Sequence, residues 1–233
     1  MADSDPRESF LTKMVPIEPS DHFPFRCRQC GECCRHVKAS VPLESLDAFR
    51  LTRYLKGRDK RIQYIDDVLA YYADPVLLHE SGYTVFMLKT VGPDDACIFL
   101  KDNRCTIHEA NPKACRTYPI SVGPNGHGGY EHYLSMEQPQ HYHGPMMSVK
   151  KWVQKRCSNQ DREFWEIDVG SAREVAQLLL QVPEDQKAQA IFLFLYYRYL
   201  AFNLEQAFLP QFQSNNERML EQLRAMAKAP KNE

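Results

Sequence analysis

The sequence predicts an α+β fold, in which a small cysteine-cluster domain with a short sheet or hairpin precedes a helical C-terminal region. Apolar residues recur at helical spacing in two early segments and again throughout the last third of the chain. Short runs rich in β-branched and aromatic residues lie between these helical patterns. We therefore expect three parts: a flexible arm, a cysteine-cluster domain and a helical region, at residues 1–22, 23–157 and 158–233.

The arm is expected to be flexible because Pro, Ser, Asp and Glu dominate it and no apolar periodicity develops before Phe23. It also has no apolar run resembling the core of a signal peptide, so we expect a cytoplasmic protein. Thiols are kept reduced in the cytosol. The eight cysteines are therefore better explained as metal ligands or redox groups than as disulfides.

The elements of the cysteine-cluster domain follow from local patterns. Residues 42–56 carry apolar side chains at spacings of three and four, with Gly57 as a stop signal, and residues 61–72 repeat the pattern. These two segments predict amphipathic helices. Residues 82–91 then predict a strand, and residues 97–108 predict a hairpin because two short apolar runs flank a turn.

The next segments are shorter and richer in proline and glycine. Within residues 109–120, Pro112 and Pro119 flank a short segment, so at most two turns of helix fit there. Residues 121–145 are rich in Gly, Pro and His and predict an irregular loop or a β-ribbon. The last third predicts a helical bundle. Its helices are expected to begin at Ser171, paired with Glu174, at Pro183, and at Ser214, paired with Glu217.

Composition excludes some partners. The chain has 233 residues, of which 43% are hydrophobic, so it can bury a core without staples. The net charge is -1, from 29 basic and 30 acidic side chains that are mixed along the chain. We therefore expect no nucleic-acid partner. Its most apolar run, 190–202, includes Arg198 and is shorter than the roughly 20 residues of a spanning helix, so we expect no membrane span.

The cysteines form the strongest chemical pattern. Cys27, Cys30 and Cys33 are each separated by two residues, and thiols at this spacing can converge on one centre while Gly31 lets the backbone approach. Ferredoxin-type iron–sulfur sites use this spacing, and zinc sites use pairs of it. We therefore predict a metal site with an iron–sulfur cluster, of the 4Fe–4S type, or zinc. The predicted ligands are Cys27, Cys30, Cys33, Cys34, Cys97, Cys105, Cys115 and Cys157.

The four crowded thiols are not expected to serve one centre together. Cys34 adjoins Cys33, and neighbouring side chains tend to point in different directions, so Cys34 is expected to face a second centre or the interior. The fourth ligand should come from a distal cysteine. We favour Cys105 and Cys115, which lie on a hairpin and on a proline-bounded turn. A distal cysteine can alternatively be inert core filler.

Other polar residues are weaker candidates. His127, His132, His141 and His143 lie in the Gly/Pro-rich segment and are expected to be solvated, so replacing His141 or His143 should leave metal content intact. Arg116 follows Cys115 and is expected either to neutralise thiolate charge or to form a surface ion pair. The aromatic residues of 192–202 are expected to pack in a core or against a partner helix.

The two cysteine blocks resemble a known family, the CxxCxxCC cysteine-cluster proteins, which are described as zinc- or iron-chelating and to which flagellin lysine methylase is related. CRQCGECC at 27–34 and CIFLKDNRCTIHEANPKACRTYP at 97–119 carry the resemblance. His108 stands where the family often has Tyr. The resemblance implies a metal-binding domain, and its link to the methylase implies protein side-chain modification as one activity.

Three functions remain open on the sequence. The first is a metal-binding accessory or redox protein. The second is an enzyme that modifies a protein side chain with the help of the cluster, although no motif in the chain demonstrates such chemistry. The third is a structural zinc module whose C-terminal helices recruit a protein partner.

Overall fold

The computed structural model describes residues 13–124 and 130–228. The chain folds as two compact units. Residues 13–42 and 87–158 form the first, called the cysteine unit here because it holds all eight cysteines. The second, the helical unit, comprises residues 43–86 and 159–228. The segment 43–86, which the sequence grouped with the cysteine domain, thus packs with the C-terminal helices.

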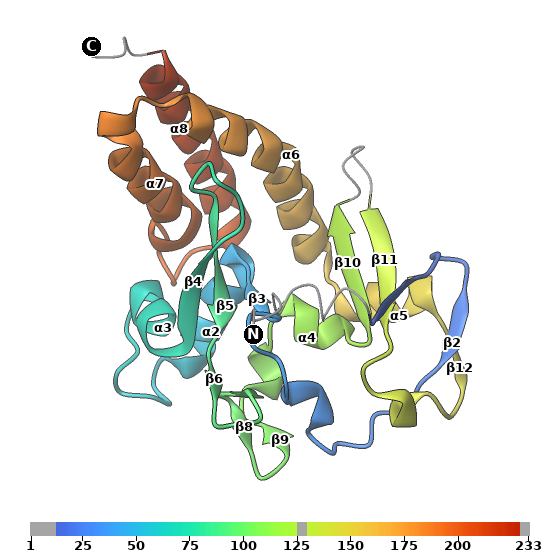
Figure 1. The fold of residues 1–233 in the computed structure, drawn as a ribbon. Coiled ribbons are helices and arrows are strands. Elements are labelled where there is room, and N and C mark those ends of the chain that lie inside the picture. Colours follow the sequence, from blue (N-terminus) through green and yellow to red (C-terminus); the bar gives the residue numbers. More distant parts are fainter. Residues whose placement is uncertain (1–12, 125–129, 229–233) are drawn as a thin grey trace, which may run out of the picture. The chain divides into compact units, whose positions relative to one another are not determined.

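The cysteine unit contains two small antiparallel sheets (Figure 1). In the first, the order is β1-β11-β10, with bounds Met14–Pro16, Tyr130–Ser135 and Ile120–Pro124. In the second, β2 (His22–Pro24) pairs with β12 (Met146–Ser148). Residues 14–16 are thus held in a sheet although they belong to the predicted arm. Residues 1–12 lie outside the described part.

Short helices and hairpins complete this unit. The helices are α4 (Lys113–Thr117) and α5 (Val149–Arg156). The 3-10 turns are η1 (Glu32–Cys34), η2 (His108–Ala110) and η3 (Pro139–His141). Two hairpins join β6 (Thr90–Val91) with β7 (Ala96–Cys97) and β8 (Leu100–Lys101) with β9 (Arg104–Cys105).

A compact aromatic cluster forms the core of the cysteine unit. Phe25 and Phe23 both pack edge-on against Trp152, at ring-centroid distances of 5.2 and 5.6 Å. Trp152 Nε1 donates a hydrogen bond to the Thr117 carbonyl at 2.9 Å, which satisfies the buried indole. This bond attaches α5 to the end of α4, the helix that carries Cys115.

The helical unit begins with α2 (Ser45–Leu55) and α3 (Ile65–Tyr72). A sheet of order β3-β5-β4 follows, with bounds Pro42–Leu43, Thr84–Leu88 and Ala73–Leu77. The chain passes between the two units within β3 and β5. The C-terminal elements are α6 (Asn159–Gln181), η4 (Glu184–Gln186), α7 (Lys187–Leu195), the π-helical η5 (Tyr196–Leu200) and α8 (Phe208–Ala227).

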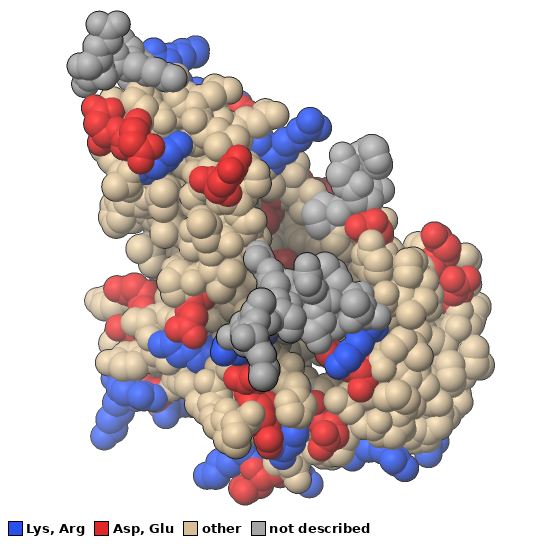
Figure 2. Space-filling model, viewed as in Figure 1, with Lys and Arg blue, Asp and Glu red and all other residues tan. Residues whose placement is uncertain are grey.

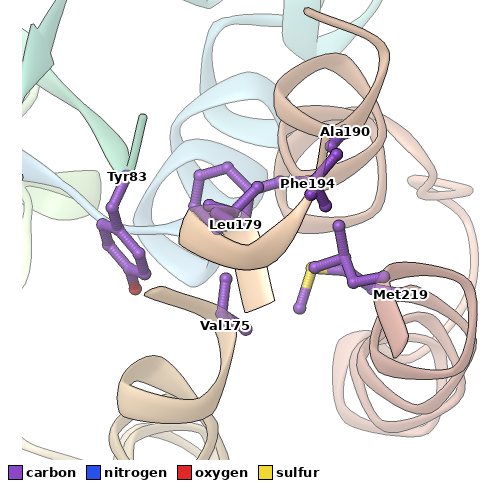
Figure 3. Packing of buried hydrophobic residues seen from close by; sticks show 8 residues of the cluster. Tyr83, Val175, Leu179, Ala190, Phe194 and Met219 are labelled. Carbon is purple, nitrogen blue, oxygen red and sulfur yellow. The ribbon is translucent and has the colours of Figure 1, made fainter. Parts of the chain in front are cut away.

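Helices α6, α7 and α8 pack side by side around an apolar core (Figure 1). Figure 3 shows side chains of this core pointing toward one another, among them Leu179 and Phe194, which are fully buried. Tyr83 stacks at a tilt on Phe194, with ring centroids 4.9 Å apart. Full burial of one such side chain stabilises the fold by about 1.5–3 kcal/mol relative to exposure, so this core is a large source of stability.

The predicted fold class, α+β with helices concentrated at the C-terminus, is confirmed. Two predicted helix starts are wrong. Ser171 lies in the middle of α6, where it is buried and its hydroxyl donates a hydrogen bond to the Ile167 carbonyl at 3.0 Å. Ser214 lies inside α8, which begins six residues earlier at Phe208. The 3-10 turn after Pro183 does lead into the aromatic helix, as expected.

Two surface properties are relevant to function. In the described part of the chain, no helix has both the length and the apolar character that crossing a membrane requires. On the face shown in Figure 2, acidic and basic side chains are interspersed, and neither sign covers a continuous area. The charge distribution therefore gives no support to a nucleic-acid surface.

Candidate metal centre

The cysteine run 27–34 packs directly on the β8–β9 hairpin. Gly31 adopts a left-handed backbone with φ of 77°, and η1 begins after it. A Cβ atom at this position would lie 3.0 Å from Asn103 Cα and 3.2 Å from Leu100 Cδ1. Only glycine therefore permits this approach without displacing the hairpin. From the sequence we expected Gly31 to let the backbone approach the sulfur atoms. In the structure, Gly31 lets the run approach the β8–β9 hairpin.

Hydrogen bonds fasten the end of the run to both hairpins. His36 N donates to Asp94 O at 2.7 Å, in the turn between β6 and β7. Arg35 Nη2 donates to the Asn103 side chain at 2.7 Å, in the turn between β8 and β9. Arg35 also lies 3.6 Å from the Asp94 carboxylate. The run is thus held between two turns that come more than 50 residues later in the chain.

Two thiols of the run interact with each other. The interaction with the Cys34 thiol lowers the pKa of the Cys33 thiol. The same interaction, together with burial, raises the pKa of Cys34. The charges of Cys115 and Cys97 raise it further. Cys34 is half-buried, whereas Cys33 is exposed. The adjacent cysteines therefore differ in environment, and the pKa of Cys34 responds to the distal thiols of Cys97 and Cys115.

The hairpins supply two of these distal thiols. Cys97 ends β7 opposite Thr90, and Cys105 ends β9 opposite Leu100. Burial raises the pKa of both thiols, and the charge on Cys33 adds to the rise. The thiols of these two sequence-distant cysteines are therefore close enough to the run for Cys33 to affect their pKa values. We call Cys33, Cys34, Cys97, Cys105 and Cys115 the five-thiol group.

Helix α4 supplies the last member of that group. Pro112 caps α4, and its carbonyl accepts a hydrogen bond from Cys115 N at 3.0 Å. Arg116, the next residue, donates to the Asn111 carbonyl at 2.6 Å. This hydrogen bond fixes the start of the proline-bounded turn. Arg116 therefore contributes to the geometry around Cys115 through the backbone of the turn.

Cys30 has a different neighbour. Its Sγ lies 3.1 Å from His141 Nε2, and the Tyr118 hydroxyl lies 3.4 Å from His141 Nδ1. The His141 side chain is only 3% exposed. Burial, followed by the positive charge of Arg28, lowers its pKa. The expectation that His141 is a solvated loop residue is wrong, because the loop carrying it folds over the run and packs against the aromatic core.

The other predicted ligands lie at the edges of the unit. Cys27 is exposed, and its Sγ accepts a hydrogen bond from Gln29 N at 3.4 Å. Cys157 is half-buried at the C-terminal end of α5, where its N–H donates to the Val153 carbonyl. The structure therefore brings six of the eight cysteines into two groups, the five-thiol group and the contact of Cys30 with His141. Cys27 and Cys157 remain predicted ligands.

The remaining histidines of the predicted loop or ribbon are spread apart. His132 lies on β11 opposite Val122, and burial lowers its pKa. His143 N donates to the His141 carbonyl at 3.0 Å, and its side chain is partly exposed. His127 lies outside the described residues. His108 begins the turn η2. Among these four described histidines, His132, His141, His143 and His108, it is His141 that contacts a cysteine side chain.

The donor chemistry fits the metals that the sequence predicts. All eight cysteines are free thiols, and thiolate and imidazole are the ligands that zinc and iron–sulfur centres use. Within residues 13–124 and 130–228, however, no three His, Cys, Asp or Glu side chains are grouped so that they could hold one ion together. The thiols of the described residues therefore do not surround a single point in this structure.

Comparison with known families agrees with this chemistry. Residues 26–158 match the family described as "CxxCxxCC: Putative zinc- or iron-chelating domain". The match covers more than half of the chain, so the protein belongs to this family. It includes every predicted ligand, from Cys27 to Cys157. No curated protein and no solved structure matches the chain significantly.

Proposed function

We propose that the cysteine unit binds an iron–sulfur cluster or zinc through ligands of the five-thiol group, and that the protein acts as a metal-binding accessory or redox protein. The observation that carries this proposal is the seating of the cysteine run on two hairpins through Gly31 and Arg35. Those hairpins end in Cys97 and Cys105. A contact this close, between segments this distant in the chain, gathers donors in one place.

The number and type of donors support the proposal. A tetrahedral zinc site or an iron–sulfur cluster needs four ligands, and the five-thiol group offers five. Three stretches of the chain contribute them: the run, the segment 90–105 that forms the two consecutive hairpins, and α4. Of the five, Cys97 is buried and three more are half-buried. A centre in this place is therefore partly shielded from solvent, which affects reduction potential and oxidation of the thiols.

Each metal would supply a different chemistry. A bound iron–sulfur cluster supplies one-electron transfer at a potential set by its surroundings. Zinc has no redox chemistry and, with four protein ligands, supplies folding free energy. For either metal the same elements position the ligands: the hairpins position Cys97 and Cys105, and the cap of α4 positions Cys115.

A structural role has its own supporting observation. The hairpin strands of the cysteine unit are two residues long, and its aromatic core is small. Strands this short are not stable alone. Metal bound by ligands from three segments would tie them together, as in small domains that fold only with metal. This candidate predicts zinc rather than a cluster.

Anaerobic purification followed by iron, zinc and sulfide analysis tests the proposal. Equal amounts of iron and acid-labile sulfide, with a brown colour, would support the redox candidate. Stoichiometric zinc in a colourless protein would support the structural candidate. Cys97→Ser and Cys105→Ser should each lose most of the metal, because each removes a ligand that a hairpin holds in place. A folded, pure protein without stoichiometric metal would contradict both candidates.

A protein partner for the C-terminal helices remains part of the proposal. Phe192 and Tyr196 stack with centroids 6.2 Å apart, and they are 63% and 43% exposed. Exposed aromatic pairs are common in protein interfaces. The double variant Phe192→Ser/Tyr196→Ser should keep its metal and its helicity, while it binds the protein partner of the native chain more weakly. An unchanged complex would contradict this assignment.

A further inference from the structure

We propose that His141 is a metal ligand that acts together with Cys30, so that the centre holding Cys30 is a mixed thiolate and imidazole site. The inference rests on the proposed function, because it assigns a further donor to metal binding by the cysteine unit. The contact between Cys30 Sγ and His141 Nε2, which spans 111 positions of sequence, is its basis.

The distance between the two donor atoms suits a shared ion. Zinc bonds of about 2.3 Å to sulfur and about 2.0 Å to nitrogen, at a tetrahedral angle, place the two donors about 3.5 Å apart. The observed separation is 3.1 Å. Binding therefore requires the two atoms to separate by only about 0.4 Å on the same bond lengths. Cys30 is half-buried, so a small rotation of its side chain can achieve this while the histidine stays in place.

His141 is held rigidly, as a ligand needs to be. Its ring packs edge-on against Phe25, with centroids 6.1 Å apart, and edge-on against Tyr118 at 6.2 Å. Its backbone N–H donates to the Gln138 carbonyl at 2.9 Å, and its carbonyl accepts from Arg26 N at 3.1 Å. The ring is therefore positioned by the core and by two backbone bonds before any metal binds.

Tyr118 occupies the place of an orienting partner. In metal sites the ring nitrogen that does not bind metal is usually hydrogen-bonded to an oxygen, which fixes the tautomer and the ring plane. The Tyr118 hydroxyl lies 3.4 Å from Nδ1, on the side of the ring away from Cys30. With Nδ1 turned to Tyr118, Nε2 faces the thiol. Tyr118 is thus a positioning residue for His141.

The same run supplies the further donors. Cys27 and Cys33 lie three positions to either side of Cys30, and both residues are exposed. Among the described residues no group of three donors is assembled. An exposed thiol can rotate toward Cys30 and His141 at little cost in packing. Either cysteine can therefore extend the pair formed by Cys30 and His141 to three ligands.

An ordinary hydrogen bond from a core histidine to a thiol would look similar, so the test has to distinguish ligation from packing. Three variants of the full chain serve this purpose. His141→Gln keeps size and polarity but removes the ligand, His141→Cys replaces it with another metal donor, and His143→Gln is the matched control two residues away. Near-ultraviolet circular dichroism establishes whether each variant is folded.

The measurements are metal affinity by competition with a chelator and cadmium NMR of the substituted protein. His141→Gln should bind metal more than about 100-fold more weakly, beyond the roughly 10–100-fold typical of an orienting partner. His141→Cys should restore binding and shift the cadmium resonance toward that of an all-sulfur site. The wild type should show coupling between cadmium and the His141 ring. Tyr118→Phe should weaken binding by roughly 10-fold, and His143→Gln should change nothing.

Two results would overturn the inference. One is a wild-type protein that binds cadmium with no coupling to His141. The other is a folded His141→Gln variant with wild-type affinity. Both results leave the proposed function intact, since the five-thiol group would still bind metal. The proposed function fails separately, if the wild-type protein binds no zinc, iron or cadmium at all.

Discussion

The two units differ in what stabilises them. The helical unit has helices of up to 23 residues around a continuous apolar core. The cysteine unit has strands of two to six residues, a smaller aromatic core and all eight thiols. Long amphipathic helices bury enough surface to be stable on packing alone, whereas two-residue hairpins do not. We therefore expect metal binding to stabilise the cysteine unit and to leave the stability of the helical unit unchanged.

Metal removal should give the largest difference between the units. Structural zinc sites supply on the order of 10 kcal/mol of binding free energy to folding. We expect a strong chelator to increase amide exchange in residues 30–36 and 96–105 by several orders of magnitude. Exchange in α6 and α8 should stay as it was. Mass-spectrometric hydrogen exchange with and without chelator measures both. Equal changes in the two units would contradict the comparison.

A buried ion pair offers a converse test in the helical unit. Arg198 and Asp168 are each 6% exposed and pair at 2.5 Å between Nη1 and Oδ1. Arg198→Ala leaves the Asp168 charge buried without its partner, so we expect the free energy of unfolding to fall by about 3–5 kcal/mol. Metal content per folded chain should be unchanged. Denaturant unfolding followed by helical circular dichroism measures the loss.

The control for this pair is the double variant Arg198→Leu/Asp168→Leu. Replacing both charges with apolar residues leaves no unpaired buried charge, so it should lose much less stability than Arg198→Ala. If the double variant were equally unstable, the ion pair would not be the cause of the loss.

Gly31 and Gly57 form a matched pair across the two units. Both have a left-handed backbone, with φ of 77° and 86°, so alanine at either position costs about 1–2 kcal/mol. Only at position 31 would the new Cβ also press on Asn103, at 3.0 Å. Gly31→Ala should therefore weaken metal affinity as well as stability, while Gly57→Ala affects stability alone. Thermal unfolding and chelator competition measure the two effects, and equal metal affinities would show that the seating on the hairpin is unimportant.

Arg35→Gln should give the smallest effect. The Arg35 side chain is 28% exposed, and partly exposed ion pairs contribute about 0–1 kcal/mol. We expect a slight loss of stability in the cysteine unit and a faster release of metal to a chelator. Arg61→Gln, which removes a pair with Asp59 in the helical unit, should not change the release. A large loss of metal from Arg35→Gln would mean that the run depends on this side chain more than on Gly31.

The sequence predicted elements with local patterns and missed those without them. The helix from Ser45 to Leu55 and the hairpin between Leu100 and Cys105 were predicted correctly, because apolar spacing and turn residues are local. The start of α6 at Asn159 was missed, since Gly170 and Ser171 in its middle look like a helix boundary. Inside the helix, the backbone carbonyls of Ile167 and Asp168 satisfy the Ser171 hydroxyl.

The sequence allowed only part of the arrangement of the candidate site to be predicted, and its ligand set remains a prediction. The pairing of the run with distal cysteines was expected, because three thiols need a fourth ligand from elsewhere. The contact of Cys30 with His141 was not, because 111 positions separate the two residues and nothing local distinguishes His141 from His143. The sequence therefore carried no signal that singles out His141.

X-ray absorption at the edge of the bound metal tests whether the cysteine unit holds a thiolate metal centre, because it counts and identifies the atoms bound to the metal in the intact protein. We expect a first shell dominated by sulfur at about 2.3 Å, with scattering from an imidazole ring that disappears in His141→Cys. A first shell of oxygen and nitrogen without sulfur would contradict the claim that the cysteine unit is organised around a thiolate metal centre.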